Sequence, residues 1–223
     1  DINLKLNHDD FNFETGFQSF ENLRIKNQND RYQYVLPYYN FDKHITKNYF
    51  NGNISFNSNG NNILNETNKL ETYLQNNLSY NSLDFISNIG LKNNFGINIK
   101  NLNSVGKKSS KYKSSIQSEL VSLYNFDVSL PLKKNTQKST NYLTPKLSLR
   151  FNPHDMKNYS SSSRNINAHN AFAVNRLGLS DTFESGRSLT LGLDYSNGQK
   201  NNIDEQQNNI DEINNYFELK LAT

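Results

Sequence analysis

The sequence predicts an all-β protein, specifically an antiparallel transmembrane β-barrel segment of about ten or eleven strands, open and curved, that belongs to a larger barrel. Apolar residues recur at every second position through most of the chain, which is the period of a β-strand. Only 34% of the residues are hydrophobic, yet the chain holds 13 Tyr and 14 Phe, so these rings need an apolar environment that a conventional core of this composition does not supply. Several alternating runs approach the ~9–11 residues that a tilted membrane strand requires.

The first part of the chain supplies the shorter alternating runs. Strands are expected at 2–6, 11–17, 32–36, 54–56 and 89–99. The segment 70–78 fits a short helical turn as well as a strand, and its neighbours favour the strand. No long amphipathic helix is predicted.

The second part supplies the longest runs, at 120–132, 143–151, 189–195 and 217–221, with a short one at Phe172 and Val174. Connections near 58–68, 101–113, 153–169 and 197–213 are expected to be long. Those near 81–86 and 179–187 are shorter, and 131–142 is an exception. Long loops at one end and short turns at the other are typical of outer-membrane barrels.

The residues between the apolar positions are Ser, Asn, Lys, Asp, Arg and Gln, so each strand has one apolar and one polar face. In a soluble sandwich the apolar face meets a second sheet, whereas in a membrane barrel it meets lipid. Strand length, aromatic residues near strand ends and the strongly hydrophilic polar face favour the barrel. A secreted β-sheet adhesin remains the soluble alternative.

Composition excludes several classes of function. The net charge of +3, from scattered basic residues, gives no reason to expect nucleic acid as a partner. The absence of Cys excludes disulfides, thiol catalysis and Cys-type zinc sites. The four histidines lack metal-ligand spacing, and no phosphate-binding or nucleophile motif occurs, so neither catalysis nor a metal or cofactor is expected. No apolar run reaches the ~18 residues of a membrane helix.

Both ends of the chain alternate as strands do, and the start does not read as a signal peptide, so a segment of a longer protein is expected. Residues 201–205 recur at 208–212, which favours a duplicated loop insertion over a helical heptad. The acidic residues of this repeat match no known cation-binding loop.

Several motifs in order resemble one family. They read DRYQYVLP at 30–37, LTPKLSLRFNP at 143–153, NRL at 175–177, DTFESG at 181–186 and LGLDY at 191–195. This order resembles the C-terminal barrel region of the LPS-assembly protein family LptD, over roughly residues 30–196. The resemblance implies a cell outer-membrane protein that takes part in lipopolysaccharide (LPS) assembly, whereas a passive porin or receptor-type barrel is the alternative.

The resemblance also implies a domain organisation and partners. The family barrel is very large and follows a periplasmic jellyroll, so residues 1–223 would form a partial barrel domain, with jellyroll, signal peptide and lateral gate outside it. The implied partners are LPS, membrane lipid, an LptE-like plug lipoprotein, and the periplasmic LPS bridge through the jellyroll.

The candidate site residues are charged or motif positions in or beside the strands: Pro37, Pro145, Lys146, Arg150, Asn175, Arg176, Asp181, Glu184, Gly186 and Gly192. The charged ones either shape the LPS path in the lumen or simply pair inside it, because charge on a lipid face costs about 2–4 kcal/mol for Arg or Lys at the membrane midplane. The prolines are expected at strand ends, edges or bulges, and the glycines at a turn and a close backbone approach. The basic run 107–113 is expected in a loop, either solvated or facing LPS phosphates.

Overall fold

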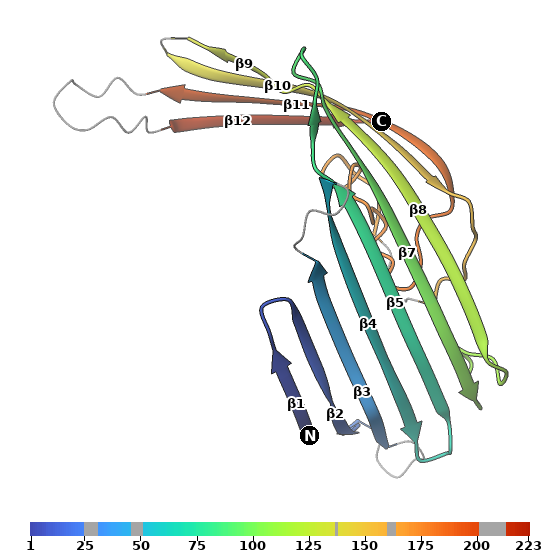
Figure 1. The fold of residues 1–223 in the computed structure, drawn as a ribbon. Coiled ribbons are helices and arrows are strands. Elements are labelled where there is room, and N and C mark those ends of the chain that lie inside the picture. Colours follow the sequence, from blue (N-terminus) through green and yellow to red (C-terminus); the bar gives the residue numbers. More distant parts are fainter. Residues whose placement is uncertain (25–30, 46–50, 137, 160–163, 201–212) are drawn as a thin grey trace.

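The computed structural model describes residues 1–24, 31–45, 51–136, 138–159, 164–200 and 213–223 (Figure 1). These residues form twelve β-strands in one antiparallel sheet and contain no α-helix. The strands are β1 (Ile2–Asn7), β2 (Phe11–Glu21), β3 (Tyr32–Ile45), β4 (Gly52–Asn65), β5 (Leu70–Ser82), β6 (Phe85–Ile86), β7 (Lys92–Lys107), β8 (Gln117–Ser129), β9 (Leu132–Asn135), β10 (Ser139–Asn152), β11 (Gly186–Lys200) and β12 (Ile213–Ala222).

The sheet is an up-and-down meander in which each long strand pairs with the next along the chain. The ten long strands follow the order β1-β2-β3-β4-β5-β7-β8-β10-β11-β12, while the short β6 and β9 pair with β7 and β10. The edge strands β1 and β12 do not pair, so the sheet stays open. The predicted all-β class and open, curved antiparallel sheet are confirmed, and 70–78 is a strand within β5.

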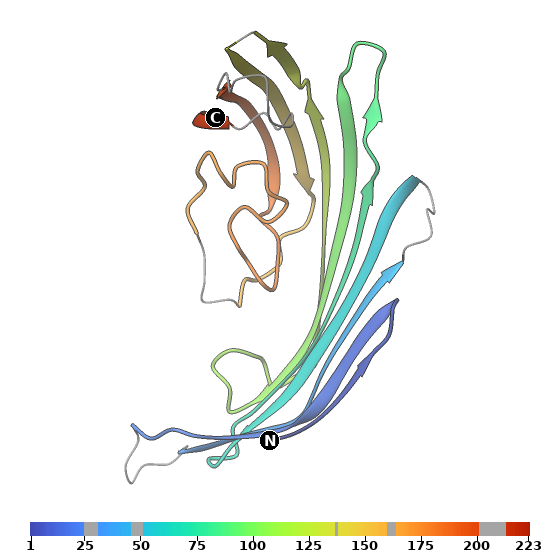
Figure 2. The same ribbon diagram turned by 90° about the vertical axis from the view of Figure 1, so that its left-hand side faces the viewer.

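The sheet curves strongly, which gives it a convex and a concave face (Figure 2). Across four strands a row of apolar residues lies side by side, because Leu189 pairs with Leu149, Leu149 with Phe126, and Phe126 with Phe95. These side chains are exposed, Leu189 at 56%, and no second sheet covers them in the described part of the chain. The sandwich alternative requires such a sheet, so it does not describe this fold.

The long strands exceed what a membrane crossing needs. At ~3.3 Å per residue and a tilt of ~35–45°, a strand of 14–16 residues reaches ~33–43 Å, whereas the apolar band of a barrel is ~25 Å tall. On β7 the face that carries Phe95, Ile97 and Ile99 continues with Asn101 and Asn103. The wall therefore extends past the apolar band at this end. No helix among the described residues is long and apolar enough to cross a membrane.

The predicted connections are partly wrong. Residues 58–65 lie inside β4 and 101–107 inside β7, so those connections shrink to 66–69 and 108–116. Both lie at the same end of the sheet as the long connection 153–185, so this end carries short as well as long connections. Residues 171–177, where Phe172 and Val174 predicted a strand, form turns instead.

Candidate functional site on the concave face

The connection between β10 and β11 turns back over the concave face instead of extending away from the sheet (Figures 1 and 2). We call residues 153–185 the inner segment; 160–163 fall outside its described part. Its chain turns locally, because the Asn167 side chain accepts hydrogen bonds from the backbone N–H groups of His169 (2.9 Å) and Asn170 (3.3 Å). The concave face is thus partly filled by the protein itself.

A small apolar core holds the inner segment to the wall. Leu102 of β7 and Val121 and Leu123 of β8 point to the concave side and are buried under Met156 and Phe183. Burying a side chain of this size stabilises a fold by ~1.5–3 kcal/mol. This core was not predicted, because 101–113 was expected to be a connection and the inner face of the 120–132 strand was expected to be polar. The sequence does carry a signal for this core, because Val121 and Leu123 occupy odd positions of β8 whereas the other apolar residues of that strand occupy even positions.

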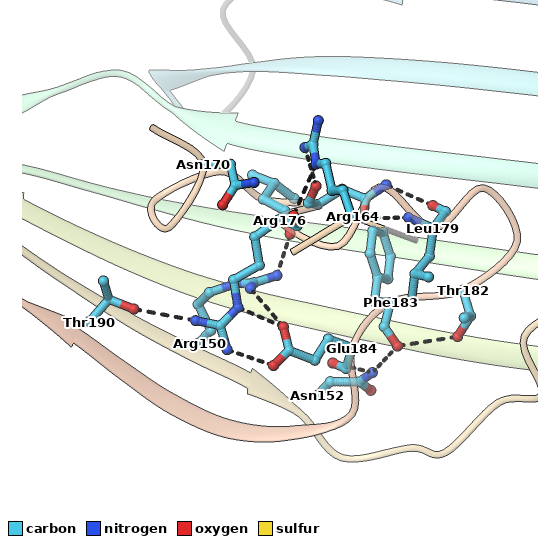
Figure 3. A network of polar contacts seen from close by, with 12 residues as sticks. Arg150, Asn152, Arg164, Asn170, Arg176, Leu179, Thr182, Phe183, Glu184 and Thr190 are labelled. Carbon is cyan, nitrogen blue, oxygen red and sulfur yellow. Dashed lines mark hydrogen bonds and ion pairs between the residues drawn. The ribbon is translucent and has the colours of Figure 1, made fainter. Parts of the chain in front are cut away.

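Arg176 and Glu184 of the inner segment form the centre of a charged network with the wall (Figure 3). Arg176 donates two hydrogen bonds to the Glu184 carboxylate, each of 2.6 Å, and one of 3.4 Å to the Thr190 hydroxyl of β11. Arg150 of β10 forms an ion pair of 3.5 Å with Glu184 and donates to the Val174 carbonyl. The hydrogen bonds from Arg176 lower the pKa of Glu184, although partial burial opposes them.

Lys100 of β7 binds the next part of the inner segment. Its ammonium donates to the carbonyl oxygens of Leu179 (3.3 Å), Ser180 (2.8 Å) and Thr182 (3.3 Å), and it lies 4.5 Å from the centre of the Phe183 ring. The Gln75 amide of β5 donates to the same Ser180 carbonyl at 3.0 Å. Lys100 was not a candidate site residue, because nothing in the sequence separates it from the other polar residues of its strand.

Further polar residues of the inner segment bond within the segment and shape its turns. The Asn175 side chain donates to the Leu179 carbonyl (2.6 Å) and accepts from the Leu179 N–H (3.0 Å). Arg164 donates to the backbone carbonyls of Arg176 (3.0 Å) and Asn175 (2.7 Å). Asp181 accepts the Ser180 hydroxyl at 2.5 Å, and its other carboxylate oxygen is buried without a hydrogen-bond partner.

Lys146 and Gly192 lie where β10 and β11 meet the inner segment. Lys146 forms an ion pair with Asp194 of β11, and its ammonium is 5.7 Å from the centre of the Phe172 ring. A Cβ atom at Gly192 would lie 2.5 Å from the same ring, so only glycine admits Phe172 here. Gly186 begins β11 with a φ of +91°, in open space.

The two candidate prolines lie within strands at irregularities of the pairing. Pro37 sits in β3 where its register with β4 shifts between Val35 and Tyr38. Pro145 pairs with Leu193 on one side, and on the other it lies where the partner of β10 changes from β9 to β8. Neither contributes to the network around Glu184, which joins Arg150 and Arg176. Asn175 and Asp181 lie on the same inner segment but bond to Leu179 and Ser180 instead.

Next to the inner segment the concave face is hydrophilic and rich in amides. The Asn57 side chain donates to Asp42 (2.7 Å), that of Asn77 donates to Asn57 (3.0 Å), and that of Gln75 donates to Asn77 (3.2 Å). Amide groups of this kind exchange hydrogen bonds readily with sugar hydroxyls. This part of the wall is therefore polar and consists mainly of amides, with the Asp42 carboxylate at its edge.

The described residues contain no cluster of three or more His, Cys, Asp or Glu side chains that would hold a metal ion. The acidic residues of the repeat, at 204, 205, 211 and 212, lie outside the described part of the chain. The four histidines belong to none of the networks above.

Comparison with known proteins agrees with this architecture. The family model of LPS transport system D, LptD, matches residues 2–211, which is most of the chain. Comparison with curated proteins gives no significant match. The chain therefore belongs to the LptD family, a family of outer-membrane proteins that act in LPS transport and assembly.

Proposed function

We propose that this chain forms part of the barrel wall that inserts LPS into the outer leaflet of the outer membrane. The saccharide part of LPS would follow the amide-lined concave face, while the lipid A chains stay in the membrane outside. One observation carries the proposal: a single curved sheet of this family has an exposed apolar face on its convex side and a hydrophilic face on its concave side.

The inner segment would narrow and orient the saccharide path. It is held by one charged network, one lysine and a small apolar core, so most of its attachment consists of directional polar contacts. In a passive porin a segment of this kind reduces the cross-section for solutes. In an LPS-inserting barrel it also sets which side of the wall the saccharide touches.

The proposal includes partners outside the described sheet. Residues 1–223 would be a partial barrel domain, completed by further strands, and a jellyroll would receive LPS from a periplasmic bridge. A plug lipoprotein similar to LptE would occupy the lumen. No catalytic step is assigned to this chain.

Depletion of the full-length protein from its own cells tests the proposal. We expect LPS at the cell surface to fall and LPS precursors to accumulate in the inner membrane, and we expect plasmid-borne wild-type protein to restore both. If surface LPS stays unchanged while the uptake of small hydrophilic solutes falls, the protein is a porin and the proposal is wrong.

A further inference from the structure

The connection 108–116 curls toward the start of the inner segment (Figure 2). A basic cavity lies between these two segments, since residues of both line it. Its volume is about 510 Å³, within the ~300–1,000 Å³ of typical ligand pockets. It is lined by four lysines, four serines, one tyrosine and one glycine: Lys108, Lys111, Lys113, Lys157, Ser109, Ser110, Ser114, Ser115, Tyr112 and Gly106. We call it the lysine cavity. No carboxylate lines it.

The connection that forms the lysine cavity is internally hydrogen-bonded. The Ser109 hydroxyl accepts the N–H groups of Lys111 (2.9 Å) and Tyr112 (3.1 Å) and donates to Glu71 of β5 (2.6 Å). The Gly106 N–H donates to the Lys113 carbonyl at 2.7 Å. These bonds fix the direction in which the loop presents its lysines.

Two tyrosines join the loop to the inner segment. The buried Tyr112 ring packs against Tyr159, with ring centres 5.2 Å apart. The Tyr159 hydroxyl donates to Glu119 of β8 at 2.7 Å, and burial together with this carboxylate raises the pKa of Tyr159 to about 12. Both hydroxyls thus stay protonated at physiological pH, since burial also raises the pKa of Tyr112.

The cations are held in place but not neutralised. The Lys111 ammonium lies 5.0 Å from the centre of the Tyr112 ring, and the Lys157 ammonium lies 4.8 Å from that of Tyr159. Within the described part of the chain none of the four cavity lysines forms an ion pair. Glu71 instead binds Lys69 at 3.1 Å and Ser109, and Glu119 binds Tyr159 and the Lys157 N–H. The Lys108 ammonium donates to the Thr67 carbonyl at 3.0 Å, so Lys111, Lys113 and Lys157 are the cations that the cavity offers to an anion.

We propose that the lysine cavity binds the phosphate groups of a phosphorylated saccharide headgroup, which in this protein is that of LPS. A phosphate monoester carries a charge of ~−1.5 to −2 and three acceptor oxygens, which the ammonium groups of Lys111, Lys113 and Lys157 and adjacent serine hydroxyls can neutralise and hydrogen-bond. The cation–π contacts restrict Lys111 and Lys157 before the ligand arrives, so less side-chain freedom is lost on binding. The assignment of LPS as ligand rests on the proposed function.

The test compares the purified full-length protein, in complex with its partners, with the triple variant K111Q/K113Q/K157Q. A matched control, K133Q/K134Q/K138Q, removes three lysines at the opposite end of the sheet. Binding is measured with phosphorylated LPS, with dephosphorylated LPS and with inorganic pyrophosphate. A triple variant with arginine at the same three positions keeps the charge, and the circular dichroism of all variants checks folding.

We expect K111Q/K113Q/K157Q to bind phosphorylated LPS at least about tenfold more weakly and dephosphorylated LPS within about twofold of wild type. We expect the control and the arginine variant to bind as wild type does, and pyrophosphate to lose its binding only in the glutamine variant. Equal affinity of wild type and K111Q/K113Q/K157Q for phosphorylated LPS overturns the proposal. If the wild-type protein binds neither form of LPS, the proposed function fails. In that case pyrophosphate binding that depends on these lysines would still support the phosphate site. If pyrophosphate does not bind either, the phosphate site is overturned as well.

Discussion

The ion pair between Arg176 and Glu184 gives the sharpest prediction about the inner segment. Glu184→Gln keeps the size of the side chain and removes its charge. Glu184 is the only carboxylate that the two guanidinium groups of Arg150 and Arg176 share in the described structure. Its loss leaves two cations facing each other, with side chains only 5% and 10% exposed.

The size of the effect follows from this burial. Breaking a buried ion pair by removing one partner costs ~3–5 kcal/mol, and an exposed pair is worth ~0–1 kcal/mol. The Glu184 side chain is 29% exposed, so solvent screens part of the interaction and we expect about 2–3 kcal/mol. This increases the equilibrium constant for detachment of the inner segment about 30- to 150-fold.

Amide hydrogen exchange of the full-length protein measures this detachment. We expect the amides of 164–185 to exchange about 30- to 150-fold faster in Glu184→Gln than in wild type. The exchange rates of strand amides in β4 and β5 should stay unchanged. Glu218→Gln is the matched control, because Glu218 pairs with Lys220 at an exposed site on β12. Exchange of 164–185 within about threefold of wild type would refute the reasoning.

The same ion pair predicts a dependence on pH. Arg176 lowers the pKa of Glu184 below its ordinary value of 4.5, so the carboxylate is charged in the folded protein at any pH above that value. Its contribution to attachment is therefore full at neutral pH and is lost as the pH falls below about 4.5, through the lowered pKa. The ratio of the exchange rate in Glu184→Gln to that in wild type should therefore fall toward one in that pH range. A ratio that stays constant down to pH 3 would contradict this.

Three further substitutions test other parts of the structure. Lys100→Met removes the donor that three carbonyls share, and those of Leu179 and Ser180 keep Asn175 and Gln75 as donors, so the inner segment should lose about 1–2 kcal/mol of attachment by hydrogen exchange, and Lys100→Arg should lose less. Gly192→Ala forces a Cβ against Phe172 and should cost about 1–3 kcal/mol in denaturant unfolding, whereas adding Phe172→Ala should recover part of it; equal loss in the double variant would argue against the clash. Leu191→Lys on the convex face should destabilise the protein in lipid by about 2–4 kcal/mol while Ile116→Lys in a loop stays near zero, and equal effects would contradict lipid contact.

Much of the sheet could be predicted from the sequence because one face meets lipid. Alternation then persists through whole strands, as at Leu189, Leu191 and Leu193, and it locates them. Residues 58–65 and 101–107 were assigned to connections because the alternation of apolar residues that located the strands does not continue through them. In the structure these residues continue the strands and bond across them, as Asn76 does to Asn101 at 3.2 Å.

Several residues of the site could be predicted from the sequence, but the conformation of the segment that carries them could not. The motif residues Asn175, Arg176 and Glu184 were identified, yet the spacing of Phe172 and Val174 predicted a strand. Two apolar residues that are two positions apart can also lie in a turn, where each side chain packs against a different part of the sheet. Phe172 lies against Gly192, and Val174 packs on the core of Leu102, Val121 and Leu123. Only the folded sheet brings those partners together.

Photo-crosslinking to LPS during transport tests the central claim most directly. A photoreactive amino acid replaces Asn57 or Asn77 on the concave face of the full-length protein in cells, and newly made LPS is labelled in a short pulse. We predict LPS adducts at both positions that appear with the pulse and disappear when delivery of LPS to the outer membrane is blocked. Folded protein that yields no LPS adduct at either position, while surface LPS continues to be made, would contradict the account.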